Sequence, residues 1–577
     1  MTSNLPLFSC PDLLTSLFLI ISYRPGPRRA SADGDSVLGT SIAAKGSLTI
    51  RCLPTASLTI NAWLLVPYHN SDALSSQYLQ SLPGPPHNFF LGHLPAVARV
   101  ATTLPRDAWD WTIMTYLHQQ MKLGDFFYLD TWPFGPPIVF ITSPELAAEI
   151  DSAAHYTRHP YMTNIVGPIV GSHSIMTASG APWKSMRSMF NPGFAHKNLT
   201  LLIEDIVEET TVFRNKLSRL AEQRELFEME DIATLLTFDV IGRAVLDEKF
   251  CSQTSANELV IAFRKQLSWL ADTNPVNVLD KLNFLRPVMN WWYHRKMEIY
   301  LRNQLASRKP NPDSKKKYVI DLALDTYRRD KKQDSLESGF MNDSNFTDVA
   351  IGNMKAFLGG GHDTTSSTIC YIYYLLSKNL AALQRVREEH DTVLGKDLDK
   401  IAELLKSQPH LLEQLPYTTA VIKEVLRLYP IGGSGKIGAD NIVLTRDGKS
   451  YPTTGMLLVT LNPAMSRRPD IYDNPEVFNP ERFLAPSSVG KESWRPFGRG
   501  AMRCIGQELA MMEMRIVMVM TLRNFDVVDA YEEIDRMKGK TNTIKEAFGD
   551  RAYQIGRVVG KANLGMPMRV AKRAISA

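Results

Sequence analysis

The fold of this chain is decided by one stretch near its C-terminus, Pro496-Phe497-Gly498-Arg499-Gly500-Ala501-Met502-Arg503-Cys504-Ile505-Gly506. Its glycines allow tight turns and positive φ angles. Residues 507–520 contain strong helix formers and neither Pro nor Gly, and after Arg515 they are apolar on every side, which predicts a buried helix. Cys504 therefore lies in a glycine-bracketed loop at a helix N-terminus.

This placement gives Cys504 a chemical meaning. Free N–H groups at the positive end of a helix favour a thiolate over a thiol, and they can hydrogen-bond the sulfur. A thiolate on haem iron pushes electron density toward bound O₂ and favours O–O cleavage. The alternative is a buried structural cysteine, the usual fate of a lone Cys. The surrounding glycines and Phe497 favour the ligand.

The spacing Phe497-x-x-Gly500-x-x-x-Cys504-x-Gly506 resembles the haem-binding loop of the cytochrome P-450 family. The resemblance covers about residues 81–572. It implies a mainly α fold with small β-sheets, an α-rich triangular prism that holds haem b between a long oxygen-activating helix and the helix after the Cys loop. The residues implied to bind the cofactor here are Phe497, Gly498, Gly500, Arg503, Gly506 and Cys504, the last as axial thiolate. Met502 stands where the family usually has an Arg that meets a haem propionate, and Arg503 follows one residue late.

A second motif lies in a predicted helix, residues 345–378. Its stretch Gly360-Gly361-His362-Asp363-Thr364 follows another glycine, and each helical glycine costs about 1 kcal/mol relative to Ala. A small-residue groove for O₂ and substrate would compensate. The stretch is similar to the family's oxygen-activating motif, which implies that Thr364 hydrogen-bonds the oxygen and Asp363 relays protons as a general acid. The alternative is a core helix whose hydroxyls bond back to the i−4 carbonyl.

Two further constellations lie in the family's order. Glu424 and Arg427 share one face of a predicted helix, residues 417–428, and Arg482 follows before the Cys loop. The resemblance implies that these three form a structural ionic triad. Trp183 and Arg187 match the family's W-x-x-x-R helix and, with Lys436, are implied to contact the haem propionates. Ser466 stands where many members have His.

The composition excludes several classes of function. The 577 residues carry a net charge of only +5 and no long Lys/Arg run, which predicts no nucleic-acid partner. The five cysteines are few and far apart, so we expect neither a disulfide framework nor a zinc or iron–sulfur site.

The chain is predicted to have three parts. Residues 1–30, with an apolar run at 13–22 followed by arginines, are a possible membrane anchor, with a cleaved signal peptide or a poorly folded leader as alternatives. Residues 31–80 resemble a tether, and residues 81–577 form one large haem domain. We expect helices to dominate up to about residue 427, a surface loop at 307–345, late strands near 441–445 and 456–460, and a cavity lined by 356–360 and 430–438.

The resemblance implies a monooxygenase that uses O₂ and electrons to hydroxylate, epoxidise or desaturate a lipophilic small molecule. NADPH would act only through a separate flavoprotein, NADPH–cytochrome P-450 reductase, docking near Arg495, Arg499 and Arg503. The residues after Cys504 and the tail 549–567 are similar to fungal secondary-metabolite and mycotoxin members, so a polyketide or terpenoid substrate is implied. We expect a location at the cytoplasmic face of the endoplasmic reticulum membrane. A haem-thiolate isomerase or dehydrase, or a non-catalytic haem-binding protein, are the alternatives.

Overall fold

The computed structural model describes residues 76–574, except 133, 154–156, 271–282, 309–315, 332–342, 434, 486–489, 491, 540–544 and 557–558, together with the short strands β1 (Thr49–Ile50) and β2 (Leu58–Thr59). The chain divides into two compact units, Met1–Val66 and Pro67–Ala577. The predicted anchor at 1–30 lies outside the described residues. No helix among the described residues is both long and apolar enough to cross a bilayer. The second unit holds the functional site.

The second unit is mainly helical with small sheets, as predicted. Its first helices are α1 (Ser76–Gln80), α2 (Leu94–Thr103), α3 (Asp110–Met121), α4 (Pro144–Ala153), α5 (Pro160–Val170), α6 (Gly180–Phe190), α7 (His196–Thr200), α8 (Ile203–Gln223), α9 (Met229–Leu246) and α10 (Glu258–Ser268). The later ones are α12 (Arg286–Ser307), α13 (Val319–Lys331), α14 (Ser344–Lys378), α15 (Leu380–Leu394), α16 (Ile401–Ser407), α17 (Pro416–Leu428), α18 (Asn462–Met465), α19 (Gln507–Thr521) and α20 (Tyr531–Met537).

The main sheet has the strand order β3 (Phe126–Leu129), β4 (Ile138–Ile141), β9 (Leu457–Thr460) and β6 (Gly435–Ile437). β4 and β9 pair in parallel, and the outer strands pair antiparallel to them. The remaining strands form small ladders of β5 (Phe227–Glu228), β7 (Val443–Arg446), β8 (Lys449–Pro452), β10 (Phe525–Asp529), β11 (Gln554–Ile555), β12 (Lys561–Ala562) and β13 (Pro567–Lys572).

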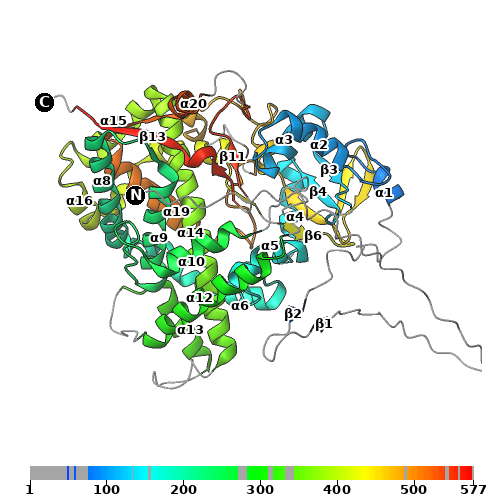
Figure 1. Cartoon of the computed structure of the whole chain (residues 1–577), viewed down its shortest axis with the longest axis horizontal. Helices are drawn as coiled ribbons and strands as arrows, with labels where there is room; N and C mark the ends of the chain where they lie inside the picture. Colours follow the sequence, from blue (N-terminus) through cyan, green and yellow to red (C-terminus); the bar gives the residue numbers. More distant parts are fainter. Residues whose placement is uncertain are drawn as a thin grey trace, which may run out of the picture. The chain divides into compact units, whose positions relative to one another are not determined.

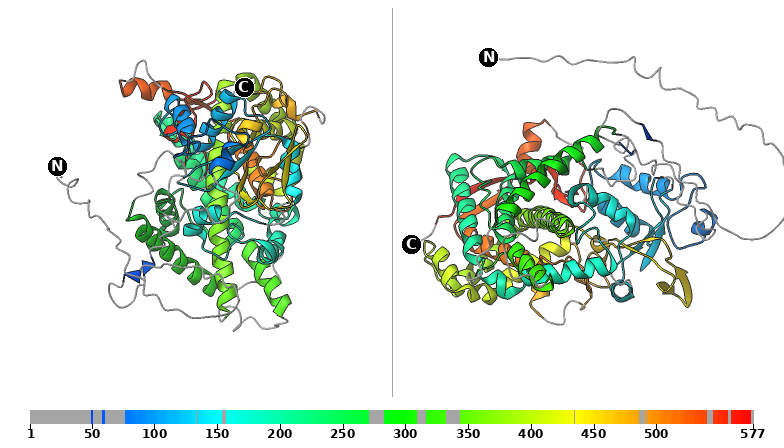
Figure 2. Two further views of the ribbon diagram at one scale, coloured as in Figure 1. Left: turned by 90° about the vertical axis from the view of Figure 1, so that its right-hand side faces the viewer. Right: turned by 90° about the horizontal axis from the view of Figure 1, so that it is seen from below.

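The helical core is built around α14. This helix packs against α9, α12, α5, α17 and α19. Figure 1 shows it close to α9, α12 and α19, to the left of the main sheet. The right-hand view of Figure 2 looks nearly along its axis and shows helices around it. α9 is buried along most of its length, and a Cβ at Gly361 of α14 would lie 2.7 Å from the Ile241 side chain of α9. Gly361 therefore allows the two helices to pack closely, and it also lines the cavity described below.

Two sequence-based expectations were wrong. The segment 307–345 is not only a surface loop, because α13 lies within it. α13 is amphipathic although it contains many charged residues, and its side chains Val319, Ala323 and Leu324 are fully buried. The strands are not all late, since β3 and β4 precede most helices. Their residues are almost all buried, so the alternation that marks a half-exposed strand is missing.

Candidate functional site

The loop before α19 places the sulfur of Cys504. Gly498 and Gly500 have φ angles of +67° and +69°, which side chains rarely tolerate. The Cys504 N–H donates to the Phe497 carbonyl over 2.8 Å and closes the turn, and Gly506 caps the helix. The glycines of the motif thus fold the chain back so that Cys504 stands at the beginning of α19.

The electrostatics of Cys504 are a balance of opposing effects. The residue is exposed to a cavity and otherwise enclosed by protein. Burial raises the pKa of the Cys504 thiol, whereas the N–H groups of Gly506 and Gln507 and the charge of Arg187 oppose the rise. The N–H groups at the start of α19 therefore favour the thiolate, as expected, and burial opposes them. A bound cation would favour the ionised form further.

The cavity that Cys504 lines has a volume of about 520 Å³, and residues of α14 form part of its wall. Asp363 and Thr364 line it together with Cys504. A Cβ at Gly360 would meet nothing within 4 Å, so α14 presents bare backbone to the cavity at this point. The Thr364 hydroxyl donates to the Gly360 carbonyl over 2.7 Å, the i−4 bond that the alternative interpretation anticipated. The same hydroxyl oxygen remains able to accept a bond from the cavity side.

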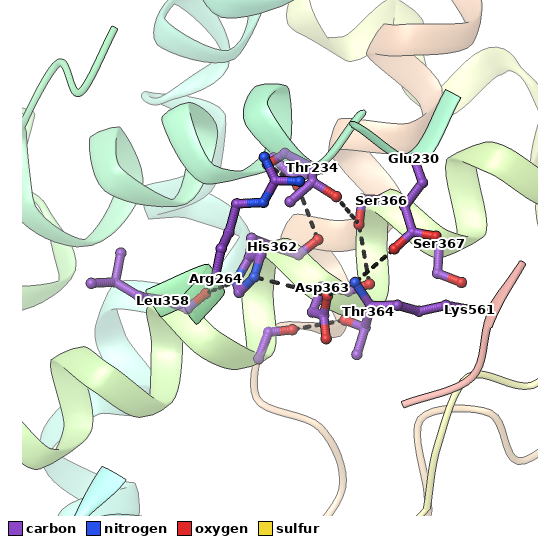
Figure 3. A network of polar contacts seen from close by, with 12 residues as sticks. Glu230, Thr234, Arg264, Leu358, His362, Asp363, Thr364, Ser366, Ser367 and Lys561 are labelled. Atoms are coloured by element: carbon purple, nitrogen blue, oxygen red, sulfur yellow. Dashed lines mark hydrogen bonds and ion pairs between the residues drawn. The ribbon is translucent and has the colours of Figure 1, made fainter. Parts of the chain in front are cut away.

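Asp363 belongs to a polar cluster that no sequence motif indicated (Figure 3). The ammonium of Lys561, on β12, lies 2.6 Å from one Asp363 oxygen and 2.7 Å from a Glu230 oxygen on α9. Although burial opposes it, the charges of Asp363 and Glu230 raise the pKa of Lys561. His362 does not line the cavity; its Nδ1 donates to the Leu358 carbonyl, and burial lowers the His362 pKa to about 4. His362 is thus neutral and buried.

Several cations line the cavity near Cys504. Arg158 donates to the Ile175 carbonyl, and its Nε has no partner among the described residues. Burial lowers the pKa of Arg158 to about 10, and no carboxylate of the described chain pairs with it. Arg187 donates over 2.9 Å to the carbonyl of Arg503. An uncompensated buried guanidinium beside a thiol and a bare helix face fits a flat cofactor that carries carboxylates, such as haem.

Lys436 and Arg495 both bind Asp151 of α4, a residue that the sequence did not indicate. Lys436 is therefore neutralised by protein, in addition to lining the cavity. Arg495 is buried, so its predicted place on a reductase-docking surface was wrong. Arg503 is exposed, and Met502 packs against the apolar core in place of the usual cation.

The structure brings Glu424, Arg427 and Arg482 together beneath the site. Two Arg427 nitrogens lie 2.7 and 2.8 Å from the two Glu424 oxygens, and Arg482 Nε lies 3.1 Å from one of them. Glu424 and Arg427 are fully buried. Arg427 also donates to the carbonyl of Ser466, the residue at the place of the family's His. This network joins α17 to the chain that leads into the Cys loop.

The functional residues that sequence reasoning missed are Asp151, Arg158, Glu230 and Lys561. Each is a charged residue outside the motifs described above. Only their tertiary contacts identify them, and no local signal could have done so. The sequence did predict the cavity-lining segments 356–360 and 430–438, from which residues 356–357, 359–360, 431–433 and 435–436 line the cavity.

Comparisons with known proteins agree with this arrangement. A family model described as cytochrome P450 matches residues 82–546. The chain is 36% identical over 499 residues to cytochrome P450 monooxygenase polC of Polytolypa hystricis, covering 85% of this chain and 89% of that protein. It is 35% identical over 503 residues to cytochrome P450 monooxygenase acrF of Aspergillus aculeatus, covering 82% and 99%. The fold is similar to the crystal structure of the cytochrome P450DA heme domain, with a TM-score of 0.65, 18% identity and coverage of 85% and 98%.

Proposed function

This chain belongs to the cytochrome P450 family of haem-thiolate monooxygenases, and from that premise we propose that it oxidises a lipophilic secondary metabolite, a polyketide or terpenoid, with O₂ and electrons delivered by a separate reductase. One observation carries the proposal. The thiol of Cys504 and the acid–alcohol pair Asp363 and Thr364 line one largely apolar cavity. A carrier of haem has no need of an acid–alcohol pair there, and a peroxide isomerase has no need of a proton donor.

The residues around the cavity divide the work of holding the cofactor. Haem, when bound, supplies the iron at which O₂ is reductively activated. Cys504, at the start of α19, would supply the thiolate that holds the iron. Arg158, Arg187 and Trp183 would bind the cofactor carboxylates, since all three line the cavity. Phe497 and the glycines of the loop, which also line it, would contact the cofactor.

Thr364 and Asp363 handle protons on the α14 side. The Thr364 hydroxyl is oriented by its bond to the Gly360 carbonyl and can exchange hydrogen bonds with oxygen that reacts above it. Asp363, only 5% exposed, is the carboxyl next in the chain and can resupply protons from the protein side. Buried apolar walls exclude bulk water from the reacting centre.

The walls of the cavity support a lipophilic substrate. The cavity is lined by Trp111 of α3, Met162 of α5 and Phe357 of α14, by Ile431 between α17 and β6, and by Val559 between β11 and β12. Such walls bind a compact apolar skeleton through burial of surface, about 25 cal/mol per Å². The lining residues support a substrate class and name no single metabolite.

A basic surface on the outer side of the Cys504 loop supports docking of an acidic flavoprotein, NADPH–cytochrome P-450 reductase. Lys184, Arg187, His196 and Arg503 line a depression there, and Lys184 and Arg503 are exposed. The double variant Lys184→Glu, Arg503→Glu should slow haem reduction by the reductase and weaken its salt dependence. Arg99→Glu on α2, an exposed charge outside this depression, is the matched control. With residues 1–30 as anchor, this surface would work at the cytoplasmic face of the endoplasmic reticulum membrane.

The proposed function is tested with the full chain loaded with haem. Candidate polyketides and terpenoids are first ranked by the difference spectrum that each produces on binding. The binders are then incubated with reductase, NADPH and isotopically labelled dioxygen. We expect product that carries the label and forms only with NADPH and reductase. Product formed without either would assign the chain to the isomerase class instead.

A further inference from the structure

The cluster around Lys561 calls for an explanation that the loop and helix motifs do not provide. Lys561 lies on β12, far in sequence from Asp363, and its ammonium is shared by the carboxylates of Asp363 and Glu230 (Figure 3). The Lys561 side chain is 29% exposed, that of Glu230 17% and that of Asp363 7%. Exposure therefore falls from the Glu230 side toward Asp363.

The cluster is fixed from several elements. Ser367 of α14 donates over 2.7 Å to the carbonyl of Gly560, the residue before Lys561. The N–H of Gly560 donates to Ile431, which lines the cavity. β12 is thus tied both to the helix that carries Asp363 and to the cavity wall. A lysine held this way loses little further freedom when it forms its ion pairs.

Lys561 is the counter-charge of Asp363, because His362 is neutral and Arg264 pairs with another carboxylate. His362 lies 3.9 Å from Asp363, but burial lowers the His362 pKa to about 4, so it is neutral. Arg264, drawn in Figure 3, pairs with Asp231 at 2.6 Å. On the far side of Lys561, burial raises the pKa of Glu230 despite the opposing ammonium.

We propose that Lys561 is a positioning residue for proton delivery, which holds the Asp363 carboxylate in place between turnovers, and that Glu230 balances the Lys561 charge at the solvent side. The inference rests on the proposed function, in which Asp363 donates protons. Asp363 gives up a proton and is left as a carboxylate paired with Lys561. It regains a proton from solvent, so that the cluster returns to its starting charge.

The two partners of Asp363 should act in opposite directions on the pH profile of turnover. Lys561→Met removes a cation and leaves two carboxylates side by side, which favours the protonated form of the pair. Glu230→Gln removes an anion and leaves the whole Lys561 charge to Asp363, which favours the carboxylate. We expect the alkaline limb of the profile to move to higher pH in Lys561→Met and to lower pH in Glu230→Gln.

The experiment uses the haem-loaded full chain with reductase, NADPH and a substrate found by difference spectroscopy. At the wild-type pH optimum, Lys561→Met should turn over about 10-fold more slowly, with a larger solvent deuterium isotope effect and more NADPH consumed per product. Lys561→Arg should restore most of the rate. The matched control is Lys572→Met. Lys572 lies on β13 and its ammonium is 2.6 Å from a Glu222 oxygen on α8, so this variant should behave like the wild type.

The outcomes separate the two proposals. If the wild type does not oxidise any bound substrate, the proposed function fails. If the wild type is active and Lys561→Met has the same rate, isotope effect and pH profile as the wild type, the inference about Lys561 is overturned and the proposed function stands. If Lys561→Met does not fold, Glu230→Gln alone decides, because an unshifted or upward-shifted alkaline limb would overturn the inference.

Discussion

Removal of the Glu424 charge is predicted to destabilise the protein far more than removal of a similar charge on the surface. Glu424 is fully buried and accepts from Arg427, Arg482 and the Asn479 N–H. In Glu424→Gln, two buried guanidinium groups lose the carboxylate that neutralises them. Breaking a buried pair from one side costs about 3–5 kcal/mol, because a charge is left without compensation.

The control is Glu481→Gln, the same substitution one residue before Arg482. Glu481 pairs with Arg385, and both side chains are 48% exposed. Exposed pairs contribute about 0–1 kcal/mol. The free energy of unfolding is measured for both haem-loaded variants by denaturant titration, followed by far-ultraviolet circular dichroism and Soret absorbance, whose coincidence supports a two-state treatment. Equal stability of the two variants, within about 1 kcal/mol, would refute the structural role given to Glu424.

Three further predictions concern the cavity and the core. Thr364→Ala should retain haem and lower the product formed per NADPH, whereas Thr392→Ala, which loses an equivalent i−4 hydroxyl bond on α15, should not. Arg158→Gln should release haem to an acceptor apoprotein several-fold faster than the wild type. An unchanged rate of haem release would show that Arg158 does not bind the cofactor. Burial, and then the charge of Asp239, raise the pKa of Glu209 to about 7 in the folded state. That contribution to stability is complete below the unfolded pKa and is lost as pH rises through 7, so Glu209→Gln should gain stability over the wild type between about pH 5 and about pH 8. If the unfolding free energies of Glu209→Gln and the wild type differ by the same amount across that pH range, the prediction for Glu209 is wrong.

The parts of the site that could be predicted from the sequence are those that are local in the chain. The turns of the Cys504 loop and the glycines and hydroxyl of α14 lie within a few residues of one another, so their spacing constrains their geometry. The ion pair of Lys561 with Asp363 depends on how β12 meets α14, and no local pattern records that contact. The same holds for Asp151, which pairs with Lys436, expected near the cofactor, and with Arg495, expected on the docking surface.

Some elements of the fold could also be predicted from the sequence, and others could not. The helices α14, α17 and α19 were predicted to within one residue at each end, because their apolar periodicity extends over several turns, whereas the long helix α12 was not predicted individually. α14 was expected at 345–378 and spans Ser344–Lys378. β3 and β4 were missed because a run of buried residues carries no periodic signal, and α13 because its apolar residues are interspersed with charged ones in a segment rich in charge.

The ligation of iron by Cys504 is tested most directly by the absorption spectrum of the reduced protein under carbon monoxide. We expect the red-shifted Soret band of thiolate ligation in the wild type and in Cys251→Ala, whose thiol is exposed and far from the loop in sequence. Cys504→Ala should lose that band. Persistence of the band in Cys504→Ala, or its absence from the wild type, would contradict the account.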